Sequence, residues 1–458
     1  MRIRRGVACC RTLVVAVLLM AGSQAAAQQI PRIAVERYTL PNGLTVLLHE
    51  DHSVPLVAVE TWYHVGSSDE QPGRTGFAHL FEHIMFMGSE HVPVGQFDKW
   101  LEAAGANNNG STTQDRTNYY EWGPSSMLPL ALWLDADRMG WLLPTMDQAK
   151  VDLQRDVVKN ERRQSVDNVP YGRADETILA ALFPANHPYH HDVIGSMDDL
   201  SAATLQDVQH FFRTYYVPNN ATLAVVGDFN RDSAKTWIGR YFDAIPRGTE
   251  AAPRPTVPSF TVARDTFLVL EDRVQIPRLY EAWHTVKIFH PDDAALDVLA
   301  YILAGDKSSR LYKDLVYEQQ VAQDVSAYQE SMHLDGLFQI VVTPKPDQTP
   351  AKMAALVNSE VQQVIDHGIT PRELARAKNT IRAQFLDRLA SDLGVASQLS
   401  LYDYYAGTPD YVQQDAARYD KVTAADVQRV ARTYLGQHKV VLTVVPEGKR
   451  ALMVGGAR

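Results

Sequence analysis

The chain has 458 residues, of which 45% are hydrophobic and 21% are charged, and its formal net charge at pH 7 is -10. This length is too great for one ordinary domain and predicts two or three domains with cores of their own. The composition excludes a disordered or fibrous chain. The acidic balance makes nucleic acid an unsuitable partner.

Residues 1–27 have the pattern of a secretory signal peptide. Four arginines flank the start of an apolar run at 13–20, and small residues follow up to Ala27. The run is far shorter than the roughly 20 residues that span a bilayer, so we predict cleavage after Ala27 and export to the periplasm rather than an N-terminal anchor. Cleavage would remove Cys9 and Cys10, which are both of the cysteines, and would change the formal charge from -10 to -14 because four arginines and no acidic residue are lost. We expect no membrane span in the rest of the chain.

The first elements in chain order mix strands and helices. Residues 38–50 predict a hairpin with Asn42-Gly43 as its turn, and residues 56–65 predict a strand. Helical spacing of apolar residues follows at 97–104, 128–143 and 148–166, and a polar, strand-like stretch lies at 110–122. The first part of the chain closes with a predicted helix at 204–215 and the strand TLAVVGD.

The same helix and strand recur near the end of the chain. TLQDVQHFFRTY at 204–215 and TAADVQRVARTY at 423–434 agree at seven of twelve positions with an offset of 219 residues, and a strand follows each. This agreement predicts an internal duplication. The proline-rich stretch 246–258 is the best linker between the copies. We therefore predict an N-terminal domain at 28–248, a linker at 249–262 and a C-terminal domain at 263–458.

The stretch TGFAHLFEHIMFMG at 75–88 carries two histidines and a glutamate in the order H-x-x-E-H. Residues four apart share a helix face, so His79 and His83 can offer two imidazole nitrogens to one metal ion, with Glu82 beside them. Zinc lowers the pKa of a bound water to about 7, and a neighbouring carboxylate can accept its proton during amide hydrolysis. The alternative is a buried core helix, because the stretch is apolar nearly all round.

A third ligand is needed, and spacing does not choose it. The acidic residues available downstream are Asp135, Asp137, Asp152, Asp156 and Glu161. The predicted duplicate lacks an H-x-x-E-H motif, so only the first copy can hold the site.

The reversed motif order marks the inverted zincins. The chain resembles the M16 (pitrilysin-type) metallopeptidases, of the short two-domain bacterial processing-peptidase-like subfamily, through the motifs YTLPNGLTVLL, GFAHLFEHIMFMGS, NERRQ, HPYHHDVIGS, VGDF and LAGDKSSRLYKDLVYEQQVA. The resemblance implies an α+β fold of two homologous LuxS/MPP-like domains with mixed antiparallel sheets. It also implies one zinc ion per chain, held by His79, His83 and Glu161, with Glu82 as general base.

Three further expectations rest on the resemblance alone. Gln154 stands where many members carry another glutamate two helical turns before the third ligand; its amide can hydrogen-bond a ligand but adds no charge. Residues Asn109, Gly110, Ser111 and Thr112 match the Asn-x-x-Thr edge strand that binds peptide by strand addition, although without the family they indicate a loop entering an ordinary strand.

Arg310 and Tyr317 match the pair that contacts substrate near the zinc, and their spacing of seven residues places them on one face of a helix about two turns apart. Without the family they would be an exposed charge and a half-buried ring.

Together these features predict an exported zinc endopeptidase acting on peptides or unfolded polypeptide segments. Because family members form a chamber from four such domains, we expect a homodimer or a heterodimer with another M16-like chain. The alternative function is a non-catalytic M16-like assembly or binding subunit. Such relatives usually lose the zinc motif or the Arg and Tyr pair, and this chain keeps both.

Overall fold

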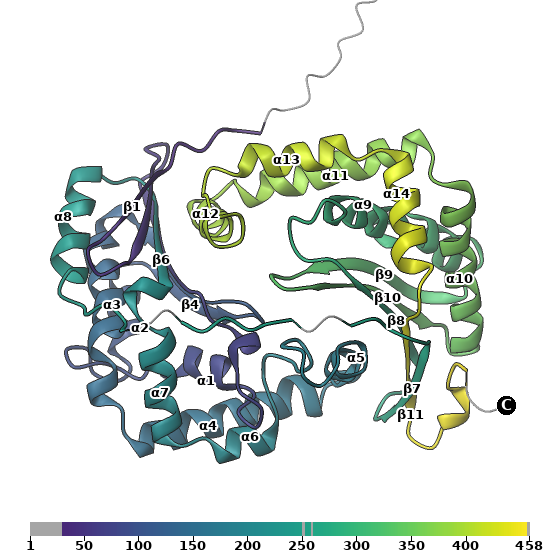
Figure 1. Cartoon of the computed structure of the whole chain (residues 1–458), viewed down its shortest axis with the longest axis horizontal. Coiled ribbons are helices and arrows are strands. Elements are labelled where there is room, and N and C mark those ends of the chain that lie inside the picture. Colours follow the sequence, from purple (N-terminus) through teal and green to yellow (C-terminus); the bar gives the residue numbers. More distant parts are fainter. Residues whose placement is uncertain (1–29, 250–251, 258–259, 456–458) are drawn as a thin grey trace, which may run out of the picture. The chain divides into compact units, whose positions relative to one another are not determined.

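The computed structural model describes residues 30–249, 252–257 and 260–455 (Figure 1). The described residues from Arg32 onward form one compact unit, which holds every element described below. The predicted signal peptide at 1–27 lies outside the described residues. Within the described part of the chain, no helix has the length and apolar character needed to cross a membrane.

A six-stranded mixed sheet organises the first half of the chain, residues 30–249. Its order is β1-β2-β6-β3-β5-β4, and its strands are β1 (Glu36–Thr39), β2 (Thr45–Glu50), β3 (Leu56–Tyr63), β4 (Asn107–Thr112), β5 (Thr117–Pro124) and β6 (Ala221–Gly227). The β1–β2 hairpin and the strand from residue 56 are confirmed. The polar, strand-like stretch expected at 110–122 contains two strands rather than one, because the chain turns back at 113–116 and forms an antiparallel pair.

The helices of the first half are α1 (Phe77–Ile84), α2 (Gln96–Ala103), α3 (Leu128–Trp141), α4 (Gln148–Arg162), α5 (Ala174–Leu182), α6 (Met197–Ala202), α7 (Leu205–Tyr215) and α8 (Arg231–Phe242). Helices α1 and α3 pack against one face of the sheet. Odd-numbered residues of β3, such as Thr61 and Tyr63, point to this face, since side chains alternate along a strand; Thr61 donates to Asp135 of α3. The main apolar core of this half lies between these helices and the sheet.

The second half, residues 260–455, repeats this sheet with five strands. They are β7 (Thr266–Asp272), β8 (Arg278–Thr285), β9 (Ala322–Ser331), β10 (Gly336–Pro344) and β11 (Val440–Pro446), in the order β7-β11-β8-β10-β9. In both sheets one parallel pair, β2–β6 or β7–β11, is followed by three antiparallel pairs. The shared order agrees with the predicted duplication, and the α+β fold is confirmed.

The α-helices of this half are α9 (Asp293–Ala304), α10 (Pro350–His367), α11 (Pro371–Arg388), α12 (Asp392–Ala406), α13 (Val412–Lys421) and α14 (Ala424–Val430). Two wider helical segments, η6 (Tyr312–Glu318) and η7 (Ala431–Leu435), have π-type hydrogen bonding. Helix α14 with η7 covers the predicted helix at 423–434. Between α8 and β7 the described residues contain no helix or strand, and the boundaries of the linker at 249–262 stay a prediction.

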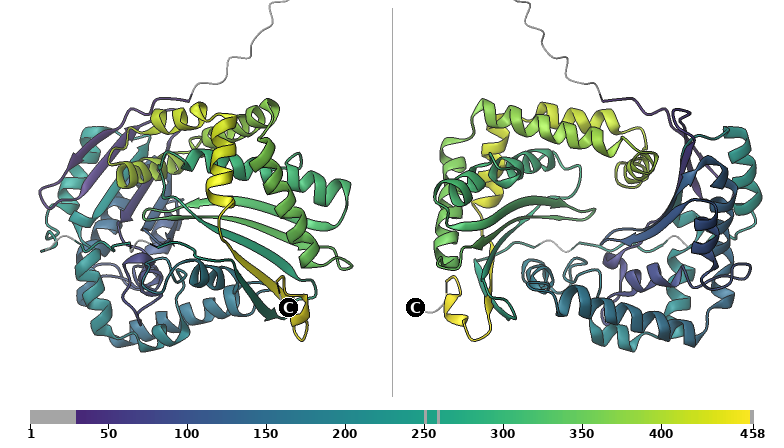
Figure 2. Two further views of the ribbon diagram at one scale, coloured as in Figure 1. Left: turned by 45° about the vertical axis from the view of Figure 1, so that its right-hand side comes forward. Right: turned by 180° about the vertical axis from the view of Figure 1, so that it is seen from behind.

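Each half contributes one helix to the other half's sheet. Helix α12 of the second half packs on β3 and β6, and α5 of the first half packs on β8 and β11 (Figures 1 and 2). Even-numbered residues of β3 face α12: Glu60 is buried there and accepts a hydrogen bond from Ser397 Oγ at 3.0 Å. The second face of the first sheet is therefore covered by a helix that belongs to the other half.

Candidate active site

Helix α1 is amphipathic, and its polar face carries the H-x-x-E-H motif. Its residues Phe77, Ala78, Leu80, Phe81 and Ile84 are buried against the core, whereas the three motif residues His79, Glu82 and His83 keep intermediate exposure. The alternative interpretation of residues 75–88, a core helix that is buried on all sides, is therefore wrong.

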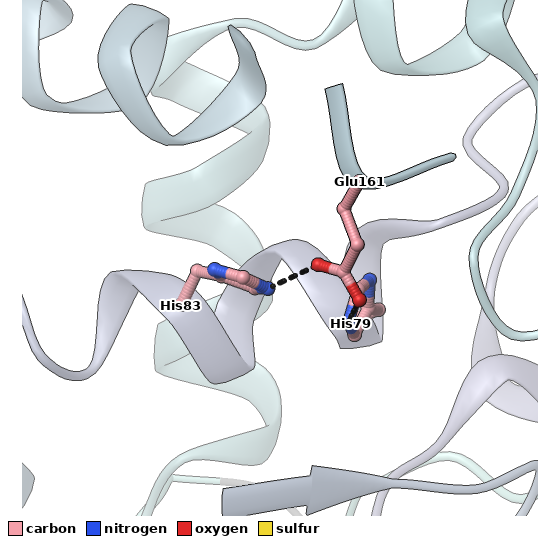
Figure 3. Close-up of side chains that lie close together, drawn as sticks. All are labelled: His79, His83 and Glu161. Carbon is pink, nitrogen blue, oxygen red and sulfur yellow. Dashed lines mark ion pairs between the residues drawn. The ribbon is translucent and has the colours of Figure 1, made fainter. Parts of the chain in front are cut away.

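Helix α4 packs beside α1 and brings Glu161 to the two histidines (Figure 3). The Nε2 atom of His79 lies 3.7 Å from Glu161 Oε1, and the Nε2 atom of His83 lies 3.2 Å from Glu161 Oε2. The three side chains each offer one ligand atom, and these atoms all lie within 4.8 Å of one another. No other group of three or more potential ligands converges in this way among the described residues.

These distances fit the needs of a zinc ion. In a tetrahedral site with bonds of about 2.1 Å, neighbouring ligand atoms lie about 3.4 Å apart. Burial and the neighbouring His83 lower the pKa of His79, and the hydrogen bond from His83 lowers the pKa of Glu161. Neutral imidazole and ionised carboxylate are the forms that bind metal. Two imidazoles and one carboxylate leave a fourth position for water or substrate, as in catalytic zinc sites.

Glu82 projects from α1 toward the edge strand β4. Its Oε2 accepts a hydrogen bond of 2.6 Å from the Thr112 hydroxyl on β4. Sequence reasoning placed Thr112 on an edge strand but missed this contact, because a hydrogen bond between residues 30 positions apart leaves no local signal. The contact fixes one carboxylate oxygen of Glu82.

A cavity of about 520 Å³ opens over this cluster. Its walls include His79, Glu82 and Glu161, and residues 110–112 of β4. The second half contributes Tyr328, Glu330, Leu337 and Gln339, from β9 and β10. Strand β4 is at the edge of its sheet, so its outer side has no strand partner within the described residues. Sequence reasoning missed the second-half residues, which carry no motif that points to the site.

Two residues that the sequence predicted for the site, Asn109 and Gln154, form hydrogen bonds outside the ligand cluster. Asn109 does not line the cavity, and its side chain accepts a hydrogen bond from the Gly110 N–H at 2.8 Å. Gln154 lies on α4 and donates to Met87 Sδ at 2.6 Å.

Arg310 and Tyr317 do not line the cavity of their own chain. Arg310 donates to both carboxylate oxygens of Glu373, at 2.7 and 3.0 Å. Burial raises the pKa of Glu373, but hydrogen bonds from Arg310 and Thr370 prevail and lower it to about 2. Tyr317 is 75% exposed. Without the family, Arg310 was expected to be exposed and Tyr317 half-buried. The structure shows the reverse, a half-buried Arg310 and an exposed Tyr317.

The expected helical spacing of this pair is also wrong. Tyr317 lies in η6, a π-type segment that begins at Tyr312, after Arg310. A π-type helix has more residues per turn than an α-helix. Seven residues consequently span less than two turns, so the spacing does not place the two side chains on one face in the way that it would on a regular α-helix.

Comparisons with known proteins agree with this architecture. The model of the insulinase family (peptidase family M16) matches residues 45–190, and the model of the peptidase M16 inactive domain matches residues 202–381. The zinc protease PqqE of Helicobacter pylori is 30% identical over 411 residues, which are 87% of this chain and 90% of that protein. An uncharacterized zinc protease of Streptomyces coelicolor, SCO5738, is 25% identical over 418 residues, 90% of each chain.

Solved structures share the fold. The crystal structure of a protease from Helicobacter pylori superposes with a TM-score of 0.86 at 27% identity, covering 91% of this chain and all of that one. A chain of complex III2 from Candida albicans has a TM-score of 0.74 at 15% identity, covering 90% of this chain and 96% of that one, which shows the fold alone. The two family matches, the duplicated fold and the similarity to PqqE establish that this chain belongs to the M16 peptidase family.

Proposed function

We propose that this chain is a zinc-dependent endopeptidase that cleaves peptides or unfolded segments of polypeptide. The observation that carries the proposal is the convergence of His79, His83 and Glu161 beside Glu82, in a cavity bordered by the edge strand β4. The three converging residues would hold one zinc ion, and Glu82 would act as the general base. The relatives' name, zinc protease, points the same way.

The edge strand indicates how a substrate would lie. An extended peptide can add to the free side of β4 through backbone hydrogen bonds, which a compact folded protein does not offer. Residues 110–112 line the cavity that also holds Glu82. A peptide bound along β4 would therefore pass the base, and unfolded or flexible segments are the substrate class that fits.

Zinc, when bound, supplies a Lewis acid that polarises the scissile carbonyl and lowers the pKa of a water at the site. Glu82 accepts the proton of the attacking water and then donates it to the departing amine. The Thr112 hydroxyl holds one oxygen of Glu82 in place during both transfers. His79, His83 and Glu161 serve only as ligands.

The decisive experiment measures metal and turnover separately. Wild type should hold close to one zinc ion per chain, and a chelator should abolish cleavage of an internally quenched peptide. Glu161→Gln should lose zinc, whereas Glu82→Gln should keep zinc and lose about 10²- to 10⁴-fold in kcat, the usual range for a general base. The matched control is Glu90→Gln, because Glu90 is exposed and does not line the cavity.

The result also separates the two candidate functions. Zinc retained in full by Glu161→Gln would remove Glu161 from the ligand set. A wild-type protein that binds zinc but cleaves no peptide, alone or with a second M16-like chain, would favour the assembly subunit instead.

We further propose that the chain is exported and works in pairs. The pattern of residues 1–27 supports removal of a signal peptide, so the mature chain should begin at Gln28, which mass spectrometry of the periplasmic fraction can check. Pairing is supported by the positions of Arg310 and Tyr317, which do not line the cavity of their own chain. In a dimer, each pair would serve the zinc site of the partner.

A further inference from the structure

The start of α1 needs hydrogen-bond acceptors that its own sequence does not supply. The first N–H groups of a helix have no partner within the helix, and the residue at the N-cap position, Gly76, has no side chain to accept them. Gly76 also has a positive φ of 88°. The acceptors come from outside the helix.

Glu70 provides them. Its Oε2 accepts from the Gly76 N–H at 2.9 Å, and its Oε1 accepts from the Ala78 N–H at 2.7 Å. The Glu70 side chain is 0% exposed. A buried carboxylate is tolerated only where its oxygens are hydrogen-bonded, and the positive end of the helix dipole favours a negative charge at this position. Burial raises the pKa of Glu70 well above its ordinary value, although the hydrogen bonds from the two N–H groups oppose this shift.

The other side of the same segment is held by the loop that carries the sequence HHDVIGS. A Cβ atom on Gly195 would overlap the backbone of Thr75 and Gly76, so the two segments are in direct contact. The Gly195 carbonyl also accepts a hydrogen bond of 2.7 Å from Arg162. Arg162 follows Glu161 directly, so this loop touches both the start of α1 and the end of α4.

The start of α1 is thus fixed between Glu70 on one side and the Gly195 loop on the other. His79 follows Ala78, whose N–H is bound by Glu70. A shift of the first turn would move the His79 imidazole relative to Glu161, which comes from a different helix. Metal affinity is sensitive to such shifts, because outer-shell partners that orient the ligands are worth about 10- to 100-fold in affinity.

We propose that Glu70 is a positioning residue of the zinc site: it holds the first turn of α1 so that His79 and His83 face Glu161. Glu70 does not touch the predicted ligands and acts through the helix backbone. The inference rests on the zinc site of the proposed function and names a residue that stabilises it.

The test compares Glu70→Gln with Glu50→Gln. The amide keeps the shape of Glu70 but replaces one accepting oxygen by an NH₂ group, which cannot accept an N–H. Glu50 is the matched control because its Oε1 accepts the Arg231 N–H at 2.8 Å at the start of α8, a helix without predicted site residues. The readouts are the zinc dissociation constant by chelator competition, the visible spectrum of the cobalt(II)-substituted protein, and thermal unfolding of the metal-free protein.

We expect Glu70→Gln to weaken zinc binding by about tenfold or more and to alter the cobalt spectrum, which reports ligand geometry. Glu50→Gln should match wild type in both. In the loaded protein, kcat of Glu70→Gln should fall more than KM changes, because the substrate strand β4 is untouched. Glu70→Asp keeps the carboxylate, but its side chain is one methylene shorter. The zinc affinity of Glu70→Asp should therefore lie between those of Glu70→Gln and wild type.

Wild-type zinc affinity and an unchanged cobalt spectrum in Glu70→Gln would overturn the proposal, even if the variant unfolded at a lower temperature, since Glu70 would then be purely structural. If Glu70→Gln does not fold, Glu70→Asp decides in the same way. A wild-type protein that fails to bind zinc would refute the proposed function instead, so the two failures are distinguishable.

Discussion

Gly110 gives a direct way to move the proposed base without touching a metal ligand. A Cβ atom at residue 110 would lie 3.1 Å from Glu82 Cγ, 3.3 Å from Asn118 O and 3.3 Å from Tyr119 Cδ1. Ordinary contacts begin at 3.4 Å, so Gly110→Ala overlaps the Glu82 side chain by about 0.3 Å. Gly110 has no positive φ, so alanine fits the backbone of the strand.

The size of the effect follows from the small displacement. Misplacing a reacting group by about 1 Å costs about 100-fold in rate, so a shift of a few tenths of an ångström should lower kcat by about three- to tenfold, or about 1 kcal/mol. Zinc content should not change, because Glu82 is not a proposed ligand. Stability should change little, since the entropic advantage of alanine over glycine in a strand, about 0.5–1 kcal/mol, offsets the close contacts.

The assay combines steady-state cleavage of a quenched peptide, zinc stoichiometry and thermal unfolding. Gly239→Ala is the matched control, because its Cβ would also meet a movable side chain, Asp243 Oδ2 at 3.3 Å, on a helix without site residues. An unchanged kcat in a folded, zinc-loaded Gly110→Ala protein would refute the reasoning that packing of residue 110 against Glu82 sets the working position of the carboxylate.

Three further outcomes are expected. Gln154→Glu should preserve zinc and alter the pH profile of kcat, because the resemblance to the family implies that this position lies near the ligands, where an added charge acts on the site; an unaltered profile would place residue 154 outside the influence of the site. The pKa of Glu373 is about 2 in the folded chain against 4.5 for the ordinary group, so the ionised Glu373, through its bonds to Arg310 and Thr370 together, stabilises the fold by at most about 3 kcal/mol above pH 4.5, and this is lost as pH falls toward 2. Urea unfolding of wild type and Glu373→Gln should therefore differ more at pH 7 than near pH 3; a constant difference would contradict the assignment. Co-expression of Glu82→Gln with the double variant Arg310→Ala, Tyr317→Phe should restore roughly a quarter of wild-type activity, because about half of the dimers are mixed and each has one intact site of two. Mixed dimers as inactive as their parents would refute a site shared between identical chains.

The sequence predicted the helix that carries the proposed metal ligands because its signal is local. Spacing of four residues places His79 and His83 on one helix face whatever the rest of the chain does. The choice of Glu161 needed the family, and the structure brings Glu161 beside both histidines. Asp135 is buried and accepts hydrogen bonds from Thr61 and Arg138, so it is occupied by a structural network. Sequence spacing contains no information on such networks.

Other features depend on contacts between distant segments and were not predictable. The carboxylate of Glu70 and the hydroxyl of Thr112 are ordinary polar groups in the sequence, and only the fold brings them to α1. The spacing of Arg310 and Tyr317 was misjudged for a different reason. Hydrogen bonding in η6 is π-type, a local choice that residue periodicity does not distinguish from an α-helix.

Each half packs one helix on the sheet of the other half. This arrangement explains why the first half needs the second half, although the second half lacks the H-x-x-E-H motif. Without α12, the first sheet would expose the face on which Glu60 now accepts a hydrogen bond from Ser397, and a buried carboxylate would lose one of its partners. Without β9 and β10, the cavity over Glu82 would lose the wall formed by Tyr328 and Glu330. The second half therefore completes both the packing of the first sheet and the wall of the cavity over Glu82. Selection on these two roles requires only that its sheet and α12 persist, which is consistent with a copy that keeps the fold and carries no metal ligands.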